Sequence, residues 1–284
     1  MRKEVYLAST SEAGRRLFKK IGIKIFVILL FVYFVIWLSG CATEYNLATQ
    51  QEERIFYNTE KEVRMGKSIS KAVEKEYELV DDPLIQKRVE DIGKKIAEVC
   101  DRKEIDYHFK VIEDEEVNAF ALPGGFIYVH SGLIEQVADD NELACVLSHE
   151  VGHIVARHSI KKLQAAMGYN FLLILMTQAP DRGKLISGAN LAFMEIISGY
   201  SREDELLADQ LGARYAKRAG YNPEGMINFL QTLQDVNRRK PLRPKSYFKT
   251  HPYIPDRIRV VKQELGQELT FDDYINIEQK PHGQ

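Results

Sequence analysis

The chain has 284 residues, of which 45% are hydrophobic and 28% are charged, and its formal net charge is −2. This is an ordinary globular composition, enough for one sizeable core or two smaller ones. The charge argues against a nucleic-acid-binding protein, because a phosphate-binding surface needs an excess of basic residues. The three cysteines are too few for a disulfide scaffold. We expect Cys100 and Cys145 to be buried free thiols, with a disulfide between them as the alternative.

Residues 1–40 have the order of segments that is typical of a secretory signal peptide. A basic segment ends at Lys24, an apolar run extends from Ile25 to Leu38, and Leu38-Ser39-Gly40-Cys41 follows. These last four residues resemble the lipobox of bacterial lipoproteins, which implies a lipid on Cys41 and a mature chain that starts there. The alternative is a single-pass membrane anchor, although the apolar run is shorter than the roughly 20 residues that a spanning helix needs.

Both alternatives place the rest of the chain on the side of the membrane opposite the basic segment. We therefore expect a protein on the periplasmic side of the bacterial cell envelope, held at the membrane by an N-terminal lipid or helix. Resemblance to the lipoprotein sorting pattern, with Ala42 after the cysteine, favours the outer membrane. A single-pass helix would instead anchor the chain in the inner membrane.

The rest of the chain is expected to comprise a linker over 41–51, a folded domain over 52–267 and a C-terminal tail over 268–284. Helical spacing begins at residue 52 and continues to about residue 79. Asp82 and Pro83 then read as the N-cap and first residue of a helix that extends to about Cys100.

Tyr107, Phe109 and Val111 alternate with polar residues, which is typical of a strand, and Pro-Gly-Gly at 123–125 is typical of a turn. The expected elements are strands near 107–111, 117–121 and 126–130 and helices over 132–137, 142–158, 201–219, 223–236 and from about 255. Two apolar patches within 161–199 indicate buried helices or a mobile lid. Helices, then a short sheet, then helices predict an α+β fold, mostly helical with a small mixed sheet.

His149-Glu150-Val151-Gly152-His153 has the H-E-x-x-H pattern. On a helix, two histidines four residues apart lie on one face and can both reach a zinc ion at about 2.0–2.1 Å. Glu150 lies close enough to take a proton from a water on that metal. The apolar neighbours of the motif predict a buried helix, in which unpaired polar groups would cost roughly 2–7 kcal/mol each without a metal.

A third ligand is still required, with a fourth position open for water. Glu205 and Asp209 are spaced by one helical turn, so that Glu205 can bind the metal while Asp209 accepts a hydrogen bond from a ligand imidazole. By itself this pair is more typical of a solvated helix face. Asp204 is expected to point away from this face, and His158 is expected to be a surface residue.

The chain also resembles the M48 family of zinc metallopeptidases, a group of gluzincins. Four segments match the family in order: residues 118–125, the H-E-V-G-H segment, 200–209 with its E-x-x-x-D spacing, and 250–257 with Thr-His-Pro and a later arginine. The resemblance implies a zincin-type domain with one zinc ion per chain, Glu205 as third ligand and Asp209 as its partner. It also implies that Asn118, Ala119 and Phe120 form an edge strand in the active-site cleft that pairs with the substrate backbone.

His251 has two alternative functional roles, and the structural alternative is a loop histidine that caps the helix that follows. In some family members the matching histidine occupies the fourth zinc position and keeps the enzyme latent, and otherwise it could stabilise the oxyanion of the reaction. Arg257 is expected to hold the His251 loop through an ion pair.

The function predicted from these features is a membrane-anchored zinc endopeptidase of the bacterial cell envelope, with Glu150 as the base. Its substrates would be proteins or peptides, and by family analogy misfolded or unassembled envelope proteins. The alternative from another class is a zinc-bearing periplasmic chaperone or assembly factor that binds peptides without cutting them, or whose proteolytic activity is latent. The intact Glu150 argues against pure binding, because binding alone needs no base.

Overall fold

A computed structural model describes residues 22, 25–26, 29–30, 43–166, 188–239 and 250–275. The chain divides into two compact units, Met1–Glu44 with Arg54–Phe56 and Tyr45–Glu53 with Tyr57–Gln284. Most of the predicted signal peptide, and Cys41 itself, lie outside the described residues. None of the helices in the described part of the chain is both long and apolar enough to span a membrane.

The first described elements differ from the prediction. Strands β1 (Thr43–Asn46) and β2 (Gln51–Arg54) form a two-stranded sheet where a linker and the start of a helix were expected. Helix α3 (Thr59–Glu76) begins only after Asn58, whose side chain accepts a hydrogen bond from the backbone N–H of Lys61. The prediction that this helix starts at residue 52 is therefore wrong. Helical spacing shows which residues share a face, whereas the N-cap decides where the helix starts.

A three-stranded mixed sheet lies at the centre of the larger unit, as the sequence predicts. It consists of β3 (His108–Ile112), β4 (Ala119–Leu122) and β5 (Phe126–His130), in the order β3-β5-β4. The central strand β5 pairs in parallel with β3 and antiparallel with β4. Within this sheet β4 is an edge strand, and it contacts helix α6 on the side of the predicted metal site.

Helices make up most of the remaining structure. They are α4 (Pro83–Val99), α5 (Ser131–Gln136), α6 (Asp140–Val155), α8 (Gly188–Ile196), α9 (Arg202–Arg218), α10 (Glu224–Arg239), α12 (Ile254–Glu264) and α13 (Asp272–Ile275). A further helical segment spans 158–166. The α+β fold is thus confirmed, and α13 lies in the stretch expected to be a tail.

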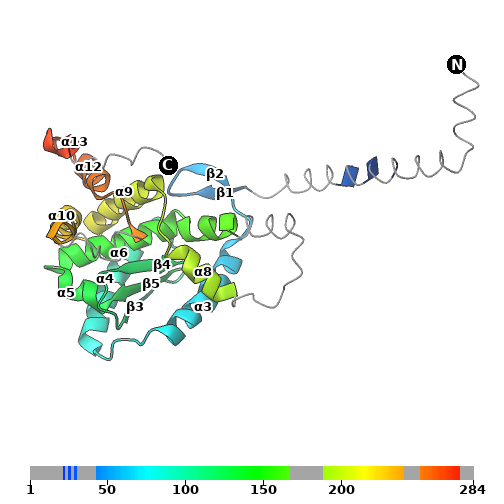
Figure 1. The fold of residues 1–284 in the computed structure, drawn as a ribbon, viewed down its shortest axis with the longest axis horizontal. Helices are drawn as coiled ribbons and strands as arrows, with labels where there is room; N and C mark the ends of the chain where they lie inside the picture. Colours follow the sequence, from blue (N-terminus) through cyan, green and yellow to red (C-terminus); the bar gives the residue numbers. More distant parts are fainter. Residues whose placement is uncertain are drawn as a thin grey trace, which may run out of the picture. The chain divides into compact units, whose positions relative to one another are not determined.

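Helix α6 is the centre of the packing. It lies between the sheet and helix α9, with α10 beside it (Figure 1). Every residue of α6 from Glu142 to Val155 is buried, so this helix is covered by neighbouring elements on all sides. Of the two apolar patches within 161–199, the second forms α8, where Phe193 and Ile196 are buried. The first patch lies outside the described residues.

Candidate metal centre

Helix α6 carries the H-E-x-x-H residues, and its start is defined by a strong cap. The Asp139 side chain accepts hydrogen bonds from the backbone N–H groups of Asn141 and Glu142. From this start the helical repeat brings His149 and His153 to one face, one turn apart. Both imidazoles and the Glu150 carboxylate are 0% exposed.

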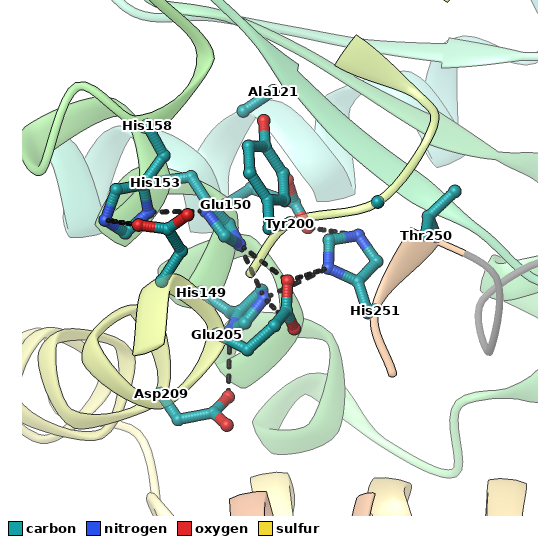
Figure 2. A network of polar contacts seen from close by, with 12 residues as sticks. Ala121, His149, Glu150, His153, His158, Tyr200, Glu205, Asp209, Thr250 and His251 are labelled. Atoms are coloured by element: carbon teal, nitrogen blue, oxygen red, sulfur yellow. Dashed lines mark hydrogen bonds and ion pairs between the residues drawn. The ribbon is translucent and has the colours of Figure 1, made fainter. Parts of the chain in front are cut away.

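Glycines allow helix α9 to approach α6 closely. A Cβ atom at Gly152 would lie 2.9 Å from the Ala208 carbonyl oxygen, and one at Gly212 would lie 3.0 Å from the backbone nitrogen of His149. Since any larger residue would push the two helices apart, these glycines set their separation. The close approach brings Glu205 and Asp209, on α9, against the two histidines of α6, as Figure 2 shows.

Four possible ligand groups converge at this crossing (Figure 2). The Nε2 atom of His149 lies 3.0 Å from Nε2 of His153 and 3.6 Å from Oε2 of Glu205. Nε2 of His153 lies 3.4 Å from Oε1 of Glu205. The Nδ1 atom of His251 completes the group, 3.4 Å from Nε2 of His149 and 3.1 Å from Oε1 of Glu205.

These separations fit a tetrahedral metal ion. Ligand nitrogens about 2.0–2.1 Å from zinc are about 3.3–3.4 Å from one another at the tetrahedral angle. The distances among the four groups scatter around that value, and imidazole and carboxylate donors are the ligands that zinc takes in proteins. Among the described residues, neither carboxylate oxygen of Glu150 has a hydrogen-bond partner, although Oε1 is 3.5 Å from His251 Nε2. A buried acceptor of this kind is suited to a water or substrate group beside the metal.

Burial and charge set the protonation of the group. Burial lowers the pKa of His153 to about 3, which keeps its imidazole neutral and able to bind a metal. Burial alone would raise the pKa of Glu205, but the charges of His251 and Arg257 hold it well below its usual value. Burial dominates for Glu150 and raises its pKa, with the His251 charge opposing the shift.

Asp209 and Arg257 lie directly behind the ligand group. Asp209 Oδ1 is 2.8 Å from Nδ1 of His149. Arg257, on α12, donates two hydrogen bonds to Asp209, at 2.7 and 2.8 Å, and also donates to the backbone oxygen of His251 at 3.4 Å. Burial raises the pKa of Asp209, but Arg257 outweighs this and lowers it. Asp209 therefore stays ionised and can hold the His149 ring in one orientation.

His158 lies in the site, so the prediction that it is a surface residue is wrong. It is buried, and its Nδ1 atom lies 2.8 Å from Nδ1 of His153 (Figure 2). Its Nε2 atom lies 3.2 Å from Oδ1 of Asp204, so that aspartate also points toward the site and not away from it. Arg157 follows the C-cap of α6 with a φ of 59°, and this left-handed residue breaks the helical repeat between α6 and the segment that carries His158. Helical spacing alone carries no signal for this contact.

Tyr200 is a second residue that the sequence patterns did not assign. Its ring stacks on the His153 ring, with centroids 4.0 Å apart and planes 20° from parallel. Its hydroxyl group lies 2.8 Å from the Ser159 hydroxyl. Because Tyr200 is itself held by Ser159, its stacked ring restricts the orientation of the His153 imidazole.

The predicted substrate-binding residues lie on or beside edge strand β4. The Ala119 oxygen is 3.3 Å from Nε2 of His251, and the Ala119 N–H donates to Oδ1 of Asn118. The Asn118 amide oxygen also accepts a hydrogen bond from the Thr250 hydroxyl at 3.1 Å. The residues around His251 thus contact the edge of β4 that the sequence analysis assigned to substrate. Cys41 lies outside the described residues.

Comparison with protein families places most of the chain in a known family. Residues 83–265 match the family described as Peptidase family M48. This range includes all four convergent groups together with Glu150, Asp209 and Arg257.

Three individual relatives are named as proteases, and two of these three as metalloproteases or metalloendopeptidases. The beta-barrel assembly-enhancing protease of Yersinia pestis is 26% identical over 217 residues, which cover 73% of this chain and 44% of the relative. The mitochondrial metalloendopeptidase OMA1 of Arabidopsis thaliana is 34% identical over 72% of this chain and 41% of its own length. The metalloprotease YcaL of Escherichia coli is 23% identical over 81% of this chain and 92% of its own length. The chain therefore spans less than half of the first two relatives.

Proposed function

The chain belongs to peptidase family M48 and is a metallopeptidase, and from this premise we propose that it is a zinc-dependent endopeptidase of the bacterial cell envelope. The observation that carries the proposal is the convergence of His149, His153, Glu205 and His251 within 4.8 Å of one another, in a buried site beside Glu150. The first three would hold one zinc ion. A zinc ion bound there would supply a Lewis acid for the scissile carbonyl and lower the pKa of water.

Glu150 is the proposed general base and acid. Burial raises the pKa of this carboxyl group, which moves it toward the neutral range where a base is most effective. It would take a proton from the attacking water and deliver it to the leaving amine. Glu150 Oε1 is near the ring of His251 at 3.5 Å, so the space it faces is the space that a scissile bond would occupy.

Asp209 and Arg257 would position these groups. Asp209 holds the Nδ1 side of His149, while Arg257 pairs with Asp209 and holds the His251 backbone. Such outer contacts fix the orientation of a ligand ring and typically change metal affinity by about 10–100-fold when removed.

His251 is the proposed latency switch. Its Nδ1 atom is among the four convergent ligand groups, and its Nε2 atom faces the Ala119 oxygen on strand β4. In this resting arrangement one ring would cover both the fourth metal position and the strand edge at Asn118, Ala119 and Phe120, where a substrate would pair. A substrate strand would have to displace it.

The proposed substrates are misfolded or unassembled envelope proteins. Two of the relatives are described as a beta-barrel assembly-enhancing protease and a metalloprotease, and the first of these names refers to assembly of barrel proteins. The lipobox-like segment ending at Cys41 supports a lipid anchor, with the outer membrane as its location.

Glu150→Gln tests the mechanism. The full chain, purified in detergent, should keep one zinc ion per chain in this variant but lose casein cleavage, because glutamine preserves the shape of the side chain and cannot accept the proton. Glu142→Gln is the matched control, since Glu142 lies on the same helix and accepts a hydrogen bond from the Ala138 N–H. Casein cleavage at the wild-type rate by Glu150→Gln would refute the proposal. A wild-type chain and a His251→Ala variant that both bind zinc and casein without cleaving it would favour the chaperone alternative.

His251→Ala separates the two roles of that residue. Under the latency proposal the variant cleaves casein faster than wild type, because the fourth position and the β4 edge are open. If His251 instead stabilises the oxyanion, the same variant should lose about 10²–10³-fold in rate. Initial rates at saturating zinc distinguish these outcomes.

A further inference from the structure

A hollow lies beside the candidate metal centre and is distinct from it. It has a volume of about 220 Å³ and is lined by residues from the end of β5, from β4 and the segment before it, and from α8. This is below the roughly 300–1,000 Å³ of pockets for whole small-molecule ligands, and it is suited to a single side chain.

The walls of the hollow are aromatic. The centroid of the Phe120 ring is 5.8 Å from that of His130 and 5.4 Å from that of Phe193. The Tyr77 ring is 6.0 Å from His130 and 6.3 Å from Phe193. These rings provide an apolar surface that could contact the methylene groups of a long side chain.

His130 is the unexplained polar group in this hollow. Its side chain is 3% exposed, and neither ring nitrogen has a hydrogen-bond partner within the described part of the chain. The nearest acidic atom, Asp114 Oδ1, is 3.6 Å from Nδ1, beyond hydrogen-bond range. Buried polar groups are nearly always paired, so an unpaired imidazole that lines a hollow points to a ligand group that reaches it.

The charge around the hollow is negative. Ligand atoms of Asp114, Glu116 and His130 lie within 4.8 Å of one another. Burial, followed by the negative charges of Glu76, Asp114 and Glu116, raises the pKa of Tyr77, which also lines the hollow. A cationic head group placed among these atoms would gain both charge complementarity and a hydrogen bond to a neutral imidazole.

The hollow is also next to the strand that faces the metal centre. Asn118 and Thr250 both line it, and each is the immediate neighbour of a residue at the metal centre, Ala119 and His251. Along a strand, Asn118 and Phe120 point to one side and Ala119 to the other. A peptide lying along β4 would therefore direct one side chain into this hollow while its backbone passes Glu150.

We propose that this hollow is a specificity subsite that takes the side chain of a lysine or arginine next to the cleaved bond. The aromatic walls would contact the methylene stem, and Asp114, Glu116 and His130 would bind the cationic head. The proposal rests on the endopeptidase function above and adds a substrate class to it.

The test compares cleavage sites of the zinc-loaded full chain with those of two charge-reversal variants. Casein is digested and the cut bonds are mapped by mass spectrometry; peptides around one mapped site are then made with Lys, Leu or Glu at the proposed position. Glu116→Lys changes an exposed residue that lines the hollow, and Glu115→Lys is the control, an exposed neighbour that does not line it.

In the wild type, one position beside the cut bond should be enriched in Lys and Arg. Exposed ion pairs contribute little binding free energy, so we expect kcat/KM for the Lys peptide to fall by about 3-fold or more in Glu116→Lys. The same variant should cleave the Glu peptide with a higher kcat/KM than wild type does. Glu115→Lys should change neither value. The proposal is overturned by cut sites without basic enrichment, by equal shifts in both variants, or by a second bound zinc ion that only Glu116→Lys removes. If neither the wild type nor the His251→Ala variant cuts any bond while both hold zinc, the endopeptidase function is refuted, and the subsite with it.

Discussion

Arg257 forms ion pairs with two buried carboxylates of the site, Glu205 and Asp209. Its replacement by methionine tests how far these pairs stabilise the folded chain. The guanidinium group is 0% exposed, donates two hydrogen bonds to Asp209, and lies 3.2 Å from Oε2 of Glu205. Methionine fills much of the same space but removes the guanidinium charge from both carboxylates, leaving Glu205 with His251 as its cation.

The expected cost is large because the remaining charge stays buried. Removing one partner of a buried ion pair typically destabilises a protein by about 3–5 kcal/mol. The loss should depend on pH. The lowered pKa of Asp209 contributes stability that is present above its unfolded value of about 3.9 and disappears as pH falls through the folded pKa. Without Arg257 that contribution is lost, so the difference between wild type and variant should be greatest near pH 7 and shrink below about pH 4.

Urea unfolding of the metal-free full chain measures this effect. A cycle with Asp209→Asn adds a second check, since the double variant should be less destabilised than the sum of the single variants by about 0.5–3 kcal/mol. Arg214→Met is the control, because Arg214 pairs with Glu264 at the surface and its loss should cost under about 1 kcal/mol. A cost for Arg257→Met no greater than that of the control, or strict additivity with Asp209→Asn, would show that the pair does not hold the site.

Two further predictions concern residues outside the motifs. His158→Ala should weaken zinc binding by about 10–100-fold, measured by competition with a chromophoric chelator, because His158 contacts the far nitrogen of His153. His108→Ala, at an exposed histidine of β3, should leave zinc affinity unchanged, and an equal loss in both variants would contradict the assignment. Cys100 and Cys145 are free and buried, and burial raises the pKa of Cys145 to about 12. Neither should react with a thiol reagent at pH 8 in the native chain, and both should react in denaturant; rapid native labelling would show that the thiols are accessible.

Local patterns along the chain were sufficient for much of the fold. The Pro-Gly-Gly turn at 123–125 predicted that strand β5 follows it, at its observed bounds, and Asp82 with Pro83 predicted the start of α4. The same holds for α6, where the H-E-x-x-H spacing places two imidazoles on one face. These features depend only on neighbours within one or two helical turns, so periodicity and capping rules reach them.

The arrangement of residues from different elements is what only the tertiary structure decided. His158 reaches His153 because Arg157 takes a left-handed conformation, which no helical repeat predicts. The carboxylates of α9 meet the histidines of α6 because Gly152 and Gly212 permit the helices to come that close. Likewise, the aromatic hollow beside β4 exists only where α8 packs against the sheet. Sequence spacing determines which side chains share a face, whereas the packing of one face against another determines the distances on which metal binding and catalysis depend.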